Sequence, residues 1–129
     1  MPTWGEIQEY VRKKYKLSHD DDESFVLNWK FSDERTQRIL VRRFNAFDQD
    51  WVEFRSAVCK EGAIPHRVAL KKNFDFVIGA LAIDADGDYV VTYSHPLASM
   101  DIDEFELPLH VIARTADNLE GSYTAEDKF

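Results

Sequence analysis

Few residues in this chain have the types and spacing that catalysis or metal binding requires. Its four histidines, His19, His66, His95 and His110, are widely separated, and no H-x-x-x-H or C-x-x-C spacing occurs. Sequences of the G-x-G-x-x-G, Walker A and G-x-S-x-G types are also absent. Cys59 stands alone in an alternating pattern that is typical of a buried structural thiol rather than a nucleophile. We therefore expect no catalytic residues, no metal site and no cofactor.

Two acidic segments contain the oxygen ligands that divalent cations prefer. In Asp84–Asp88, a calcium loop of the EF-hand type would need a glycine at its sixth position and an acid at its twelfth. Gly87 is instead at the fourth position and His95 at the twelfth, and apolar segments flank the run, so we predict a hairpin turn. The run His19–Glu23 could also bind a cation, but its density of charge favours a solvated loop.

Arg35, Arg38, Arg42 and Arg43 form a basic cluster in a chain with 24 acidic and 16 basic residues and a formal charge of −8. Such a cluster can bind an anionic or acidic partner. It can equally be a solvated strand surface, or pair across a sheet with an acid such as Glu53. The net negative charge repels phosphate backbones and anionic lipids, so we expect neither nucleic acid nor membrane as a partner.

The elements that must position these residues belong to one domain. A chain of 129 residues can form a single packed core, and its 44% hydrophobic content argues against disorder. We therefore assign residues 1–129 to a single domain. No apolar run is long enough to span a bilayer, and Met1–Tyr10 has no signal-peptide core, so the expected location is cytoplasmic.

The first half of the chain predicts a helix followed by three strands. Thr3 and Glu6 have the spacing of a capping box, and apolar residues then recur at helical intervals until about Leu17. Alternating apolar residues and short polar turns predict an antiparallel meander. Its strands are Phe25–Phe31, Thr36–Phe47 and Trp51–Cys59.

The second half predicts a short helix, a hairpin and a closing helix. The short helix is placed at Pro65–Asn73 because proline suits a first helical turn. The hairpin strands are Phe76–Ile83 and Tyr89–His95, and the first is apolar on both faces, which predicts that both are covered. The closing helix carries a stripe at helical spacing: Ile102, Phe105, Leu109, Ile112, Ala116, Leu119 and Tyr123. Pro108 either kinks this helix or precedes a start near Leu107, and Gly121 suits its end.

The fold class is therefore α+β, in the order helix, three-stranded antiparallel meander, short helix, β-hairpin and C-terminal helix. This order resembles the type III secretion chaperone-like superfamily, in particular its YbjN-like branch. The segments Phe105–His110 and Ala116–Glu120 look like the final helix of that family, with its Ala-Asp pair. The resemblance implies a non-enzymatic homodimer of chaperone or regulatory type whose partner is a client or regulatory protein. The alternative is a small enzyme or small-ligand-binding protein with a pocket between the sheet and the C-terminal helix.

The resemblance also directs attention to exposed apolar side chains as a partner-binding site. We expect a groove along the first helix and first strand that includes Trp4, Tyr10 and Val26, with Arg38 and Arg42 at its rim to orient an acidic partner. Trp4 and Tyr10 point in different directions around the helix axis, so both cannot enter one narrow core stripe. The other possibility is that these aromatic side chains complete the core of the monomer.

A second copy of the chain is the expected cover for the doubly apolar strand Phe76–Ile83, because helices of so small a domain cover one side of a sheet more easily than two. We place the two-fold interface at the short helix and the hairpin, with Pro65, Leu81 and Ile83 as its residues.

Overall fold

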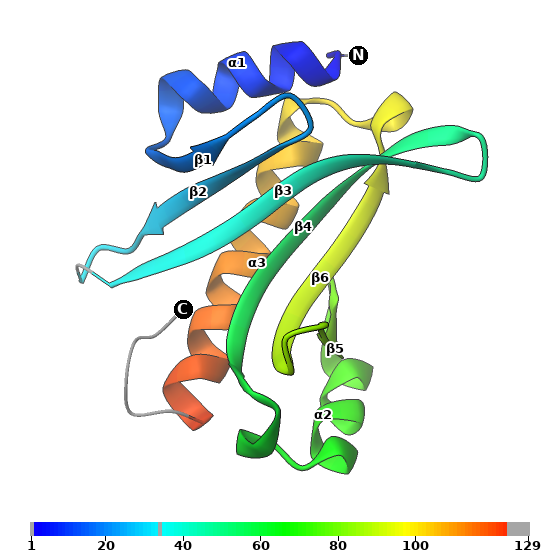
Figure 1. Ribbon diagram of the computed structural model, residues 1–129. Coiled ribbons are helices and arrows are strands. Elements are labelled where there is room, and N and C mark those ends of the chain that lie inside the picture. Colours follow the sequence, from blue (N-terminus) through cyan, green and yellow to red (C-terminus); the bar gives the residue numbers. More distant parts are fainter. Residues whose placement is uncertain (1, 34, 124–129) are drawn as a thin grey trace.

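The computed structural model describes residues 2–33 and 35–123, which form three α-helices and six strands (Figure 1). The helices are α1 (Trp4–Lys14), α2 (His66–Lys72) and α3 (Ile102–Tyr123). The strands are β1 (Leu17–Asp20), β2 (Ser24–Lys30), β3 (Thr36–Ala46), β4 (Gln49–Lys60), β5 (Ala80–Ile83) and β6 (Asp88–Pro96). The α+β class and the order of the predicted elements are confirmed.

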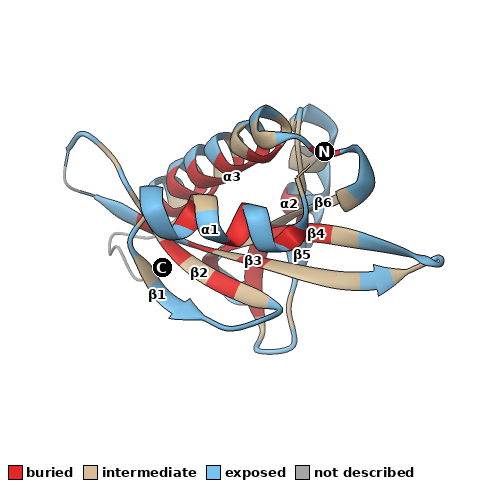
Figure 2. Cartoon of the chain, turned by 90° about the horizontal axis from the view of Figure 1, so that it is seen from above, coloured by how far each residue is buried: buried red, intermediate tan, exposed pale blue. Residues whose placement is uncertain are grey.

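All six strands form one antiparallel sheet in the order β1-β2-β3-β4-β6-β5. The sheet joins the predicted meander to the predicted hairpin because β4 pairs with β6 over most of its length. Helices α1 and α3 lie on the same side of the sheet (Figure 2). The opposite side, which we call the open face, is turned toward the viewer in Figure 1, where α3 passes behind β3 and β4.

The core lies between the sheet and helices α1 and α3. Alternate residues of the central strands point toward α3 and are fully buried, as the period of two predicts: Phe25, Leu27, Ile39, Val41, Val52, Phe54 and Val58. The α3 stripe meets them, and Phe105, Leu109, Ile112 and Ala116 are each 0% exposed. The ring centroids of Phe54 and Phe105 are 5.4 Å apart. Each such large side chain stabilises the fold by about 1.5–3 kcal/mol.

The first predicted helix is shorter than expected, and a strand follows it. Helix α1 ends at Lys14 instead of near Leu17, and β1 occupies Leu17–Asp20 at one edge of the sheet. Its pairing with β2 is irregular between Leu17 and His19. Ser18, His19 and Asp20 are exposed, so this strand has no buried alternation that the sequence could display.

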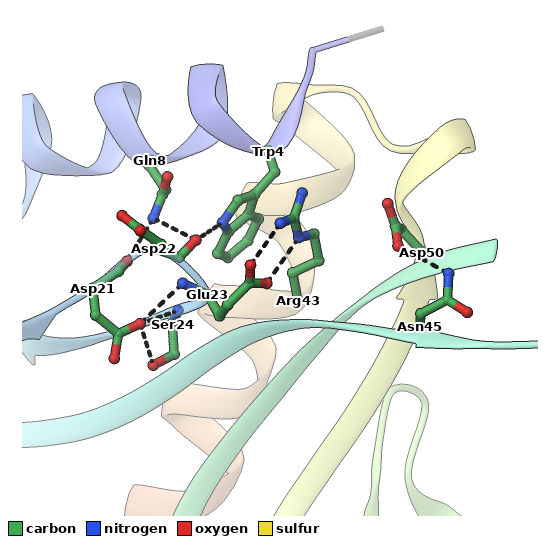
Figure 3. A network of polar contacts seen from close by, with 9 residues as sticks. All are labelled: Trp4, Gln8, Asp21, Asp22, Glu23, Ser24, Arg43, Asn45 and Asp50. Carbon is green, nitrogen blue, oxygen red and sulfur yellow. Dashed lines mark hydrogen bonds and ion pairs between the residues drawn. The ribbon is translucent and has the colours of Figure 1, made fainter.

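The prediction of a solvated loop at His19–Glu23 is wrong for its first two residues, because they belong to β1. The remaining residues form the β1–β2 turn, which is hydrogen-bonded to α1 (Figure 3). Trp4 donates from Nε1 to the carbonyl of Asp22 at 2.8 Å, and Gln8 donates from Nε2 to the carbonyl of Asp21 at 2.8 Å. The acidic side chains stay in solvent, but the turn backbone is held because helix side chains satisfy its carbonyl groups.

The predicted strand Phe76–Ile83 is reduced to β5, Ala80–Ile83, at the other edge of the sheet. Gly79 precedes it with φ +92°, a conformation that breaks the extended chain, and Val77 is 94% exposed. The expectation that both faces of this segment are covered within a sheet is therefore wrong. A Cβ atom at Gly79 would lie 2.9 Å from Cδ1 of Ile112, so the glycine also allows α3 to approach.

Helix α3 is continuous from Ile102 to Tyr123, and Pro108 lies inside it. A start near Leu107 is therefore wrong, as is an end at Gly121. Asp101 directly precedes the helix. Its carboxylate accepts from the Glu104 backbone N–H at 2.7 Å, while the Glu104 carboxylate accepts from the Asp101 N–H at 3.1 Å. This reciprocal cap fixes the helix start upstream of the proline.

The β3–β4 hairpin ends in a strained turn that extends beyond the neighbouring strands (Figure 1). Ala46 pairs with Gln49, so Phe47 and Asp48 form the turn, with φ values of +53° and +61°. Positive φ at both positions is the type I′ arrangement, which Asn-Gly adopts with less strain than Phe-Asp. Trp51 donates from Nε1 to the Ala46 carbonyl at 2.9 Å and holds the base of the turn.

Candidate functional site

The five predicted partner-binding residues lie on two sides of the sheet. Trp4 is 4% exposed and stacks on Phe25 at 5.6 Å, so it completes the core on the helix side. Val26, Arg38 and Arg42 belong to the open face, because their neighbours in β2 and β3 point toward α3. The structure therefore does not bring the predicted set together in one groove.

Tyr10 belongs to a polar cluster between α1 and α3. Its hydroxyl donates to Glu106, whose Oε1 also accepts from Nζ of Lys14 at 3.1 Å, and whose Oε2 accepts from the Tyr15 hydroxyl at 2.7 Å. Burial opposes ionisation of Glu106, but these donors outweigh it and hold its pKa below the usual value. Burial and the same carboxylate raise the pKa of Tyr15. The cluster therefore fastens α1 to α3.

The open face carries a buried carboxylate. Glu53 is 7% exposed and accepts from Nε of Arg42, from Nη2 of Arg55 at 2.9 Å and from Oγ1 of Thr92 at 3.0 Å. Burial alone would raise its pKa, but the two guanidinium groups keep it lower than usual. The predicted cross-strand pairing of the arginine cluster to Glu53 is confirmed for Arg42.

The other arginines of the cluster differ in their partners. Arg43 pairs with Glu23 at 2.8 Å (Figure 3), and Arg35 pairs with Asp33 at 2.7 Å. Arg38 is exposed and has no ion-pair partner among the described residues. It borders a trough of about 390 Å³ on the open face. The trough is lined by Val26, Arg38, Leu40, Arg55, Ala57, Asp84, Asp86, Asp88 and Val90.

A second surface surrounds α2 and is apolar. Leu70 is 70% exposed, Phe74 92% and Ile83 42%, and we call these three residues the α2 surface. Leu70 borders two depressions, one of about 710 Å³ shared with Phe74 and one of about 270 Å³ shared with Ile83. Exposed apolar side chains that adjoin one another are typical of protein–protein contact sites.

The residues predicted for the dimer interface lie around this α2 surface. Pro65 is exposed at the start of α2, and Leu81 and Ile83 border the smaller depression. Leu81 is only 7% exposed, because it packs inside its own protomer. Asn73 bonds to both the N–H of Leu81, at 2.6 Å, and its carbonyl, at 3.3 Å, and so occupies the outer edge of β5. The backbone of Leu81 is therefore not available to pair with a strand of a partner, so a partner at this position would contact side chains.

Leu70 and Phe74 were not predicted as functional residues, although the sequence contains a signal for them. Val68, Ala69 and Leu70 are consecutive in a seven-residue helix, so they point in different directions around its axis. Only Ala69 of the three is buried. A short helix with apolar residues all around it cannot place them all in one core.

The alternative function needs a pocket between the sheet and α3. That space is filled by packed side chains, because Phe54, Leu109 and Ile112 are each 0% exposed there. Cys59 is buried, and burial raises the pKa of its thiol, which weakens it as a nucleophile. No set of three or more His, Cys, Asp or Glu side chains suited to a metal ion occurs in the described part of the chain. Across the same residues, no helix has the length and apolar character to cross a membrane.

Comparison with known proteins identifies the class of fold. The chain resembles one chain of the ExsC–ExsE complex, with a TM-score of 0.66 and 12% identity over 97% of this chain and 98% of that chain. It also resembles one chain of the HopA1–SchA chaperone–effector complex, with a TM-score of 0.64 and 12% identity over 89% of this chain and 88% of that one. The predicted type III secretion chaperone-like fold is therefore confirmed.

The sequence itself gives no closer assignment. No protein-family model matches it, and no curated protein matches it.

Proposed function

We propose that this chain is a non-enzymatic protein-binding module of chaperone or regulatory type, of the YbjN-like kind, that acts as a homodimer in the cytoplasm. The observation that carries the proposal is the exposed apolar α2 surface on a chain of this fold. Leu70 and Phe74 border one depression, and Leu70 and Ile83 border the next, so a partner could bury them together. Burial of each such side chain on association is favourable because apolar area leaves water.

The homodimer is tested by light scattering of the purified protein, which we expect to give twice the chain mass of 15.0 kDa at micromolar concentration. Leu70→Asp and Phe74→Asp should give the monomer mass, because each places a charge in the two-fold contact. Leu107→Asp is the matched control, since Leu107 is also apolar and 60% exposed but lies on α3. A monomer mass for the unmodified protein would end the homodimer proposal.

The α2 substitutions are preferable to changes at Leu81. Leu81 is buried within its own protomer, so Leu81→Asp would unfold the hairpin region as well as perturb a dimer. The fold of each variant should be checked by circular dichroism before its mass is interpreted.

The protein-binding role is tested by affinity capture from the native cytoplasm, followed by reconstitution of the complex from the two purified proteins. We expect a client or regulatory protein that forms a complex of fixed stoichiometry. The enzyme alternative makes a different prediction, which is turnover on a hydrolase or phosphatase panel that Cys59→Ala or a histidine-to-alanine change abolishes. Turnover with that dependence would replace the proposed function.

A further inference from the structure

The trough on the open face has charged walls of opposite sign and an apolar floor. Leu40, Ala57 and Val90 come from three adjacent strands and form much of the floor. Arg38 and Arg55 supply basic groups, and Asp86 lies on the acidic turn between β5 and β6. This turn projects from the open face, away from α3 (Figure 2).

The basic groups of the trough have unused hydrogen-bonding capacity. Arg55 is held by Glu53 through Nη2, at 2.9 and 3.1 Å, while its Nε is buried and has no acceptor among the described residues. Arg38 has no ion pair there either. Arg42, by contrast, is engaged by Glu53 and lies 4.7 Å over the Phe44 ring. A buried N–H without an acceptor is unfavourable, so an anionic group that enters beside Arg55 and Arg38 is stabilised.

On the acidic side of the trough, some carboxylates already have partners among the described residues and one does not. Asp84 is used by the turn itself, because its Oδ1 accepts from the backbone N–H groups of Asp86 and Asp88, each at 3.0 Å. Asp88 pairs with Lys60 at 2.9 Å. Asp86 is exposed and makes no ion pair with any described residue. The trough therefore offers an unpaired anion opposite an unpaired cation.

We propose that the trough binds an extended segment of a protein partner, with an acidic side chain at Arg38 and Arg55, a basic side chain at Asp86 and an apolar side chain between them. Alternate side chains of an extended chain point to the same side and are about 6.6–6.8 Å apart. The recognised pattern is therefore an acidic and a basic residue on the same side of the extended chain, in either order, with an apolar residue between them on that side. This inference rests on the proposed protein-binding function and names the chemistry of the partner.

A polypeptide fits the trough better than a small molecule. Sites for small ligands bury most of the ligand surface in a concave pocket. This trough lies across the surface of a sheet between Val26 of β2 and Val90 of β6, and it is not enclosed by helices. A chain that continues past both ends can gain contacts there that a small zwitterion cannot.

The test is selection of short random peptides on the purified protein at low salt. The unmodified protein should enrich the acidic–apolar–basic pattern. Arg38→Glu should enrich peptides with two basic residues instead, and Asp86→Lys should enrich peptides with two acidic residues, whichever way the peptide runs. Arg114→Glu is the matched control, because Arg114 is exposed on α3 and makes no ion pair among the described residues. It should leave the pattern unchanged.

A labelled peptide of the enriched pattern should bind Arg38→Glu about tenfold more weakly than the unmodified protein, and added salt should reduce that difference. Arg42 is unsuitable for this test because it neutralises buried Glu53. Absence of enrichment, or an enriched pattern that Arg38→Glu does not alter, would overturn the inference. Binding of free amino acids without any peptide selection would overturn it in favour of a small-ligand site.

The failure of this inference can be told apart from failure of the proposed function. If the unmodified protein and Arg38→Glu capture the same cellular partner equally, the trough is not the contact, and the protein-binding function stands. If the unmodified protein selects peptides through the trough but forms no complex with any cellular protein, the proposed function fails while the chemistry of the trough is retained.

Discussion

The close approach of α3 to the segment before β5 makes Gly79 and Ile112 an energetically coupled pair. A Cβ atom at Gly79 would lie 2.9 Å from Cδ1 of Ile112, and 3.2 Å from both Cγ1 of Val91 and the carbonyl oxygen of Thr92. The positive φ of +92° adds about 1–2 kcal/mol of strain for a residue with a side chain. Overpacking adds about 1–3 kcal/mol. Gly79→Ala should therefore lower the free energy of unfolding by about 2–5 kcal/mol.

Ile112→Val removes Cδ1, the atom that the new methyl group would strike first. Alone it should lower the free energy of unfolding by about 0.5–1.5 kcal/mol, the usual effect at a fully buried isoleucine. Combined with Gly79→Ala, it relieves the closest contact, while the φ strain and the Thr92 contact remain. The double variant should then be about 0.5–1.5 kcal/mol more stable than the sum of the two single effects predicts.

The assay is urea unfolding followed by tryptophan fluorescence, with the four free energies combined as a double-mutant cycle. Gly62→Ala with Ile112→Val is the control cycle, because a Cβ atom at Gly62 meets nothing within 4 Å. Its two effects should add to within about 0.5 kcal/mol. Additivity in the Gly79 cycle as well, or a neutral Gly79→Ala, would refute the argument that α3 packs against this glycine.

Three further predictions concern the polar cluster, the strained turn and pH. Glu106→Ala should lower the free energy of unfolding in urea by about 1–3 kcal/mol at neutral pH, because the Tyr15 hydroxyl loses its acceptor; an unchanged value would show that α1 is not fastened there. Replacing Phe47-Asp48 by Asn-Gly should raise the melting temperature, because both residues of the turn have positive φ; a decrease would mean that the turn is unstrained. Glu53 and Glu106 have pKa values below their ordinary value of 4.5. Their stabilising effect is therefore complete above that pH and is lost as the pH falls through the lower folded-state value. Urea unfolding from pH 7 to pH 3 should show this loss of stability, and Glu106→Gln should make the loss smaller. A pH profile identical for Glu106→Gln and the unmodified protein would contradict that assignment.

The core was predictable from the apolar stripe of the last helix and from the alternation in the strands. Once these elements were recognised, their periodicity required Phe54 and Ile112 to point inward, and both are buried. Edge elements were less predictable because they depend on distant contacts. After Leu17, strand β1 is polar and exposed. It forms through its pairing with β2 and through the hydrogen bonds that Trp4 and Gln8 donate to the following turn. The sequence before β5 is apolar throughout, so it did not show that the strand begins only after Gly79.

The candidate site was harder to predict than the fold because it depends on which side of the sheet each side chain occupies. The alternation in β2 already placed Val26 opposite Phe25, but only the contact of Trp4 with Phe25 shows that Trp4 is on the other side of the sheet from Val26. The lining of the trough was also hard to predict, because it depends on the order of the strands in the sheet. Asp86 comes near Arg38 because β6, rather than β5, pairs with β4.

The chain order of the core elements has a consequence for synthesis on the ribosome. Strands β2 to β4 are complete at Lys60, yet α3, which covers their apolar side, begins only at Ile102. At about 5–20 residues per second, the intervening segment of about 40 residues takes roughly 2–8 s to translate. During that interval the nascent hairpins expose Val52, Phe54 and their neighbours to other nascent chains. A protein proposed to bind other polypeptides is thus itself prone to aggregation until its last helix emerges.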